Sequence, residues 1–183
     1  MNQITRIVSI GFVSFSLFVG CSSTQATNLS LNNTPIQVYF SPHGGCTDAI
    51  VKEIAKANSE ILVQAYSFTS KDIAKALVDA KKRGLNVEII LDKSNRSRKY
   101  SAADFTFNMG ITTYIDAQHA IAHNKIIIID GETVITGSFN FTKAAEEKNA
   151  ENLLILKNRD LAEVYIENWN RHKGHSVLYE GKQ

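Results

Sequence analysis

A histidine and a lysine two positions apart stand just before a run of four isoleucines. His123 and Lys125 precede this run, and Ser138 and Asn140 follow it after the Asp130-Gly131 pair. In a β-strand, residues i and i+2 point to the same face, so each pair projects its side chains together. Antiparallel pairing across a tight turn at 130–131 would bring the two pairs side by side. An imidazole, an ammonium group, a hydroxyl and an amide at one spot suit a phosphate, since they offer positive charge, donors and a nucleophile for phosphorus.

Each of these residues alone has a commoner explanation. A lone histidine is more often a surface or core residue than a nucleophile, a lone lysine is usually solvated, and Asp-Gly is a good turn. The joint spacing is far more specific, and it reads His123-x-Lys125-x₄-Asp130-x₆-Gly137-Ser138, extended by Asn140.

This spacing resembles the HxKxxxxD signature of the phospholipase D superfamily. The layout is similar to the small, exported, metal-independent bacterial endonucleases of that superfamily, which carry one motif per chain. Glu151, eleven residues after Asn140, resembles a carboxylate position of that branch. The resemblance implies that Asp130 and Gly137 are structural members of the motif.

The resemblance also implies a phosphodiesterase whose active site needs two copies of the motif. The other four histidines lack a lysine two positions on, so a homodimer is implied, in which each chain contributes His123. One His123 would form a phosphohistidine and the other would protonate the leaving oxygen. Lys125, Asn140 and Ser138 would stabilise charge on the phosphate oxygens. Glu151 would orient His123. The sequence shows no clustered ligand set, so we expect no metal and no cofactor.

The substrate is predicted from the basic residues and from the single motif. A segment at 93–99 contains no acidic residue and carries Lys93, Arg96, Arg98 and Lys99. It follows a predicted strand, so it either contacts a phosphate backbone or is a solvated loop. Phe105, nearby, could stack on a base, but a core role is preferred. The net charge is only +2, from 20 Lys+Arg and 18 Asp+Glu, which excludes a strongly basic nucleic-acid coat.

A nonspecific endonuclease acting on DNA or RNA is therefore the preferred function. The alternative is a phospholipase D that acts on phospholipid headgroups, although no apolar acyl-binding segment lies near the motif. A non-catalytic phosphate-binding protein is disfavoured by the complete motif.

Strands and helices must alternate to position these residues. Strands are predicted at 36–41, 60–67, 86–92, 112–115, 125–130, 133–136 and 152–156. Helices are predicted after Thr47 or Asp48, after Ser70 up to Gly84, at 102–109 and at 159–172. This alternation predicts an α/β layered sandwich with a mostly parallel mixed central sheet, covered by helices on both faces.

The N-terminal segment has the pattern of an export signal. Residues 1–20 combine a basic start with a short apolar run, which predicts a signal peptide. Phe18 to Cys21 resembles a lipobox, so Cys21 is a candidate for lipidation, with cleavage after Ala26 or an uncleaved anchor as alternatives. Residues 21–35 are predicted to be a flexible tether, 36–175 a single phospholipase D-like catalytic domain, and 176–183 a tail. We expect an exported protein, either periplasmic or tethered to the membrane through Cys21. Cys46 is expected to be a small buried residue.

Overall fold

The run of four isoleucines forms a strand in the middle of a sheet. The computed structural model describes residues 26–96 and 101–181. Strand β5 (Lys125–Ile129) is buried along its whole length. It pairs antiparallel with β2 (Glu60–Ala65) on one side and with β6 (Thr133–Gly137) on the other. The turn between β5 and β6 has φ of 54° at Asp130 and 62° at Gly131, as a type I′ hairpin requires.

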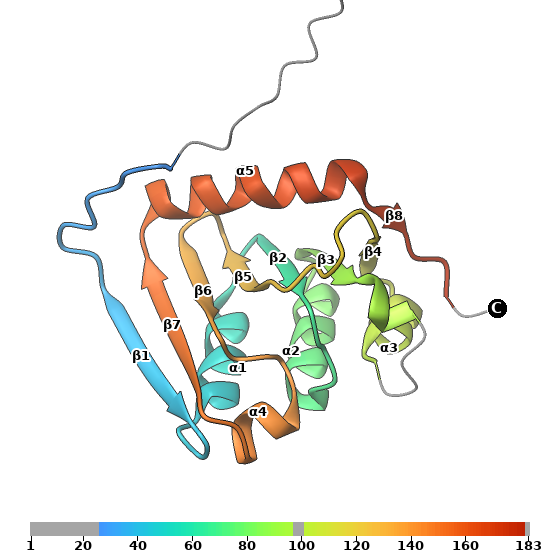
Figure 1. The fold of residues 1–183 in the computed structure, drawn as a ribbon, viewed down its shortest axis with the longest axis horizontal. Helices are drawn as coiled ribbons and strands as arrows, with labels where there is room; N and C mark the ends of the chain where they lie inside the picture. Colours follow the sequence, from blue (N-terminus) through green and yellow to red (C-terminus); the bar gives the residue numbers. More distant parts are fainter. Residues whose placement is uncertain (1–25, 97–100, 182–183) are drawn as a thin grey trace, which may run out of the picture.

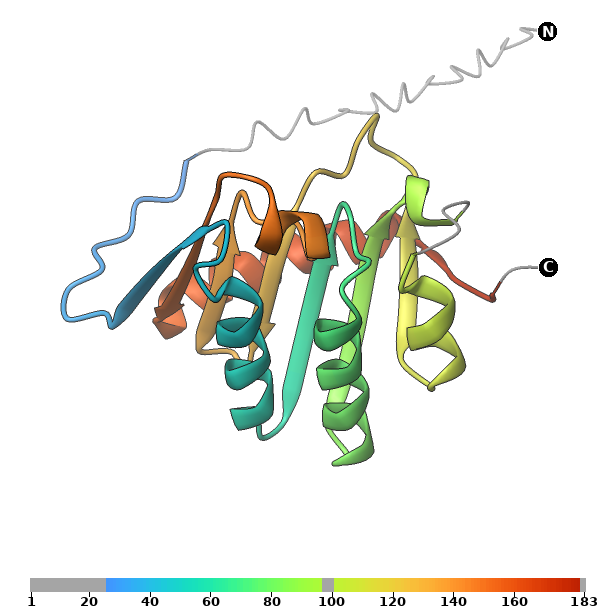
Figure 2. The same cartoon turned by 90° about the horizontal axis from the view of Figure 1, so that it is seen from below.

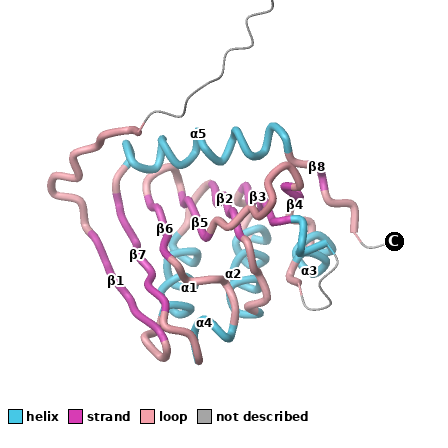
Figure 3. Tube along the Cα trace, in the orientation of Figure 1, coloured by secondary structure: helices cyan, strands magenta, loops and turns pink. Residues whose placement is uncertain are grey.

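The described residues form one sheet with the strand order β1-β7-β6-β5-β2-β3-β4-β8 (Figure 1). The remaining strands are β1 (Ile36–Ser41), β3 (Asn86–Asp92), β4 (Thr112–Asp116), β7 (Glu151–Lys157) and β8 (Val177–Leu178). The helices are α1 (Cys46–Lys56), α2 (Lys71–Lys82), the 3₁₀ helix η1 (Lys93–Arg96), α3 (Ala103–Asn108), α4 (Lys143–Glu147) and α5 (Arg159–His175). Figure 3 shows how these elements alternate along the chain.

Helices cover both faces of this sheet, which confirms the predicted α/β class. Figure 2 shows α1 and α2 in front of the strands, with α5 behind them. Between the sheet and α1 and α2 lies the larger core, which includes Ile50, Leu77 and Ile127. A smaller core under α5 includes Trp169, whose Nε1 donates to the Val63 carbonyl at 3.0 Å.

The pairing within the sheet is mixed rather than mostly parallel. Only the β2–β3 and β3–β4 pairs are parallel, and each is joined through a crossover helix, α2 or α3. The pairs β1–β7, β7–β6, β6–β5, β5–β2 and β4–β8 are antiparallel. The hairpin at 130–131 reverses the chain without a helix, so β5 and β6 must run in opposite directions.

Helix α2 begins and ends as the sequence predicts. Ser70 Oγ accepts from the Ile73 N–H at 3.4 Å, and Gly84, with φ of 94°, follows its end. Helix α1 differs, because neither Thr47 nor Asp48 caps it. Instead, the Glu146 carboxylate, from α4, accepts from Gly45 N at 3.0 Å and Thr47 N at 2.7 Å. Such a long-range cap leaves no local sequence signal.

The domain continues beyond residue 175, where the sequence placed its end. Strand β8 pairs with β4, and Tyr179 is buried, with its ring edge-on to Phe107. The apolar contacts of Tyr179 therefore hold part of the expected tail on the domain.

The predicted signal peptide and Cys21 lie outside the described residues, so these assignments stay predictions. Among the helices that the structure describes, none combines the length and apolar character that crossing a bilayer requires.

Candidate active site

His123 is an exposed imidazole that lies against an aromatic ring. It belongs to the loop between β4 and β5, and its ring centroid is 4.6 Å from that of Tyr66. Tyr66 directly follows β2, and its backbone N–H donates to Asn124 O at 2.8 Å. Sheet pairing thus continues past the strand ends and sets the position of His123, while its exposed ring stays accessible to a substrate.

Lys125 lies beneath His123 and is nearly buried. Its side chain is 7% exposed, and Nζ donates to the His123 carbonyl at 2.8 Å. Nζ also lies 5.3 Å from the Tyr66 ring centroid, within reach of a cation–π contact. Burial lowers the pKa of Lys125, and the nearby Glu151 carboxylate partly opposes that change. The arrangement therefore holds a cation next to the nucleophile candidate.

Asn140 is fixed between two buried aromatic residues. Phe139 and Phe141 are both 0% exposed and belong to the core. Phe141 forms an isolated bridge with Phe68, two residues after Tyr66. The 66–68 segment therefore contacts both the His123 loop and the segment that carries Asn140. Asn140 Oδ1 is buried without a hydrogen-bond partner, an unusual state for a buried polar atom.

Ser138 and Glu151 are bound to each other. Ser138 Oγ donates to Glu151 Oε2 at 2.6 Å and accepts from Asn152 N at 3.1 Å. Asn149 Nδ2 donates to the other carboxylate oxygen at 3.1 Å. In the described part of the chain, the two oxygens of Glu151 thus face Ser138 and Asn149, and its contact with His123 stays a prediction.

Gly137 and Asp130 have contacts that explain their residue types. A Cβ on Gly137 would lie 2.3 Å from Asn152 O, and its φ of 147° disfavours any other residue. Asp130 lies at the opposite end of β5 from Lys125. Its Oδ1 accepts from Ser59 N at 2.9 Å and Glu60 N at 3.0 Å, and Oδ2 accepts from Asn58 N at 2.8 Å. Burial would raise the pKa of Asp130, but these donors outweigh it and lower the pKa to about 2.

Only part of the predicted basic segment lies in the described residues. Lys93 and Arg96 form the ends of η1, and both are exposed. Lys93 Nζ donates to the His119 carbonyl at 3.0 Å, so it holds the loop before His123. Arg98 and Lys99 lie outside the described residues. Phe105 is 47% exposed, so its expected core role is wrong, because short α3 turns that side chain outward.

Two residues that sequence reasoning did not single out also position His123. Tyr66 supplies the ring surface described above. Asp92 is 2% exposed, and its Oδ2 accepts from Ala122 N at 2.9 Å, one residue before His123. Burial favours the neutral carboxyl, yet hydrogen bonds from Ser94 and Ala122 keep the pKa of Asp92 below its usual value. The sequence signal that could have identified Asp92 is its place as an acidic residue at the carboxyl end of a predicted strand.

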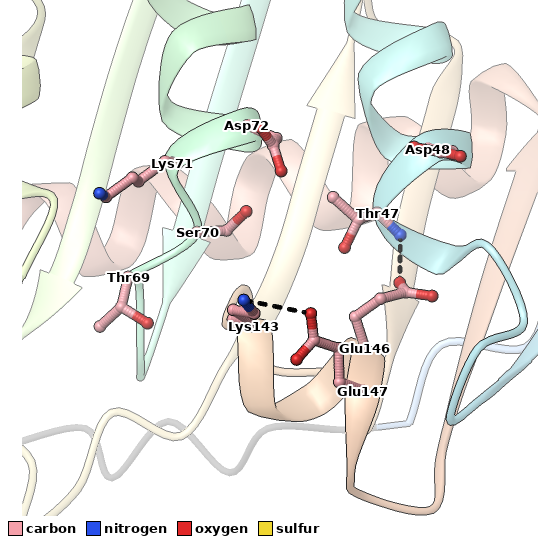
Figure 4. Close-up of a pocket in the computed structure, with 9 residues that line it drawn as sticks. All are labelled: Thr47, Asp48, Thr69, Ser70, Lys71, Asp72, Lys143, Glu146 and Glu147. Carbon is pink, nitrogen blue, oxygen red and sulfur yellow. Dashed lines mark hydrogen bonds and ion pairs between the residues drawn. The ribbon is translucent and has the colours of Figure 1, made fainter.

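A surface hollow and the thiol of Cys46 do not belong to this group of residues. A hollow of about 470 Å³ lies between the N-terminal ends of α1 and α2 and helix α4 (Figure 4). Its lining has both signs of charge, including Lys71, Asp72 and Glu146, and does not include His123. Cys46 is 0% exposed as expected, and burial raises the pKa of its thiol to about 11, which disfavours the thiolate.

The comparisons with known proteins agree with this geometry. The family described as "Cardiolipin synthase, PLD-like domain" matches residues 50–173. A protein of Rickettsia conorii named "Phospholipase D" is 42% identical over 159 residues, which cover 86% of this chain and 80% of that protein. Its counterpart in Rickettsia felis is 44% identical over 143 residues, which cover 78% and 72%.

Solved structures show the same fold. The phospholipase D family member Nuc from Salmonella typhimurium superposes with a TM-score of 0.77 at 42% identity, covering 80% of this chain and 98% of that one. NucT from Helicobacter pylori superposes with a TM-score of 0.75 at 24% identity, covering 80% and 99%, which supports the fold alone. Given this similarity and the arrangement of His123, Lys125 and Asn140, the chain belongs to the phospholipase D superfamily and is a phosphodiester hydrolase.

Proposed function

We propose that this hydrolase is a metal-independent, nonspecific endonuclease that works through a phosphohistidine at His123. The observation that carries the proposal is an exposed imidazole supported by Tyr66, with the nearly buried Lys125 beneath it. An imidazole so placed can approach phosphorus, while the adjacent cation offsets the charge that develops on the phosphate oxygens.

Two histidines are needed for the proposed reaction. His123 Nε2 attacks phosphorus, a P–N bond forms, and the P–O bond to the leaving group breaks. The leaving oxygen must then take a proton, which the imidazole bonded to phosphorus cannot supply. The partner's His123 donates that proton, then removes one from a water that attacks phosphorus and breaks the P–N bond.

A homodimer supplies this second histidine. Each chain carries one such motif, and a two-fold axis beside His123 would place two copies of Lys125 and Asn140 around one phosphate. The Asn140 side chain, whose Oδ1 has no hydrogen-bond partner, would turn its amide N–H₂ toward a non-bridging oxygen.

The dimer is tested by mixing subunits. Excess His123→Ala chains are exchanged into wild type, and the rate is compared with that after mixing wild type with itself. We expect the inactive chains to lower the rate beyond dilution, since a mixed dimer keeps one imidazole. Sedimentation of a monomer that is fully active at every dilution would contradict the dimer.

A nucleic-acid substrate is supported by the fold shared with Nuc at 42% identity and by exposed Lys93 and Arg96 at the end of β3. The second candidate is a phospholipase D that acts on phospholipid headgroups. It is favoured by the relatives of that name from Rickettsia conorii and Rickettsia felis, which are 42% and 44% identical.

The two substrates are separated by parallel assays of the same preparation. Supercoiled plasmid is followed on a gel, and choline release is followed from phosphatidylcholine vesicles, both in excess EDTA with His123→Ala as the control. We expect plasmid to be nicked and cut while choline release stays at the level of the control. Choline release with intact plasmid would favour the second candidate. Circular dichroism in the same buffer separates loss of chemistry from loss of fold.

A further inference from the structure

Three imidazoles converge on one buried carboxylate at the end of the sheet, apart from the candidate active site. Asp116, the last residue of β4, has a fully buried side chain. Its Oδ2 lies 2.7 Å from His172 Nδ1, 3.1 Å from His119 Nδ1 and 3.3 Å from His175 Nε2. His119 Nδ1 also lies 3.3 Å from Asp116 Oδ1. Three imidazoles are therefore gathered around one buried carboxylate, a set of groups that can ligate a metal ion.

A single bound cation accounts for it. We propose that Asp116, His119, His172 and His175 form a structural zinc site. Their ligand atoms all lie within 4.8 Å of one another. In a tetrahedral zinc site with bonds of about 2.0–2.1 Å, neighbouring ligand atoms are about 3.3 Å apart. The contacts of His119 and His175 with Asp116 Oδ2, at 3.1 and 3.3 Å, are close to that spacing, whereas the 2.7 Å contact of His172 is shorter and would lengthen on metal binding.

The donor set selects the class of metal. Three imidazole nitrogens and one carboxylate oxygen suit Zn²⁺ and its transition-metal neighbours, whereas Mg²⁺ and Ca²⁺ prefer oxygen ligands. Four protein ligands fill a tetrahedron and leave no position for a reacting water, which is the pattern of structural sites. Asp116 Oδ1 accepts from Gln118 N at 3.1 Å, so a backbone contact orients the carboxylate and leaves Oδ2 toward the metal.

The site has a route for metal entry. The side chain of His119 is 43% exposed, that of His175 25% and that of His172 15%. The ring centroids of the three histidines are 4.9–5.2 Å apart. The imidazoles thus form a partly open rim over the buried carboxylate.

The metal would join two segments that are far apart in the sequence, 116–119 and 172–175. Asp116 ends β4, His119 lies in the loop that leads to His123, and His172 and His175 lie one turn apart on α5. Zinc would therefore fix the His123 loop and the end of α5 to the sheet. Because the site excludes His123, the reaction can be independent of metal while the fold is stabilised by it.

Metal content tests the site directly. The full-length chain is produced without a histidine tag in zinc-supplemented medium, and its zinc is measured after gel filtration. We expect about one zinc per chain in wild type, and near-complete loss in His119→Ala and His175→Ala. The matched control is His43→Asn, which removes an exposed histidine outside the cluster at a position with φ of 61°, where Asn is tolerated. This control should keep its zinc.

Two further readouts separate a built site from surface binding. Co²⁺ added to metal-free wild type should give the intense visible bands of tetrahedral coordination, and His119→Ala should not. Zn²⁺ at about 100 times its dissociation constant should raise Tm by roughly 5–10 °C in wild type and not in His119→Ala, while Mg²⁺ should have no effect.

Some outcomes would overturn the proposal. The first is a zinc content of wild type that is no higher than that of the two alanine variants. The second is a Co²⁺ spectrum typical of octahedral coordination. His119 lies on an exposed loop, so its variant carries the test even if His175→Ala does not fold.

Discussion

Asp130→Asn should weaken the fold while leaving the chemistry intact, although Asp130 belongs to the catalytic motif. The carboxylate accepts from the backbone N–H groups of Asn58, Ser59 and Glu60. These donors outweigh burial and lower its pKa from 3.8 to about 2, which corresponds to about 2 kcal/mol of stability. The carboxylate is partly exposed, so this value is an upper bound. Asn tolerates the φ of 54° at this position, so the substitution tests charge rather than backbone strain.

The pH dependence has a defined sign. A carboxyl group whose pKa is lower in the folded state stabilises the fold above its unfolded pKa, and that contribution disappears as pH falls through the folded pKa. Urea unfolding should therefore show wild type up to about 2 kcal/mol more stable than Asp130→Asn at pH 7. The difference should shrink between pH 4 and pH 2, the window set by the two pKa values.

The control is Asp79→Asn, an exposed substitution on α2 that should change stability by less than about 0.5 kcal/mol. At a temperature where Asp130→Asn is folded, its kcat should stay near the wild-type value. Unchanged stability at pH 7, or a large loss of kcat in the folded variant, would refute the structural role of Asp130.

Three further substitutions test other contacts. Asn140→Ala should lower kcat by about 10²–10³-fold with little change in KM, if Asn140 stabilises charge that develops in the transition state; an unchanged kcat would remove it from the site. Glu151→Gln should lower the pKa of Lys125 further, because Glu151 now raises it, so the alkaline limb of the pH–rate profile should move to lower pH; a shift to higher pH would contradict this. Gln64→Met should raise the free energy of unfolding by about 1–3 kcal/mol, since both amide atoms of Gln64 are buried without partners beside Ile90 and Ile126; a destabilised variant would show that the amide is satisfied.

The sequence predicted the parts of the fold that depend on local patterns. The isoleucine run, the Asp130-Gly131 turn and the Ser70 cap each carry their signal within a few residues, and each forms as expected. Whether two paired strands run parallel or antiparallel was harder to predict from the sequence. It depends on which strands meet across the sheet, and β1 and β7 pair through residues more than a hundred positions apart.

Some residues of the candidate site could also be predicted from local patterns, and others could not. His123, Lys125 and Asn140 are predicted as site residues from their spacing alone. Tyr66 and Asp92 contribute through contacts that only the folded sheet creates. The proposed zinc ligands consist of two pairs, each with a spacing of three residues, at 116–119 and 172–175. Either pair alone is unremarkable, and the fold brings them together.

The central claim is that His123 becomes covalently bonded to phosphorus during turnover. It is tested most directly by quenching the reaction in base, which preserves phosphohistidine, and by mapping substrate-derived phosphate onto peptides by mass spectrometry. The account predicts the adduct on the peptide that contains His123, present only while substrate turns over and absent in His123→Ala. An adduct on another residue, or full activity in His123→Ala, would contradict it.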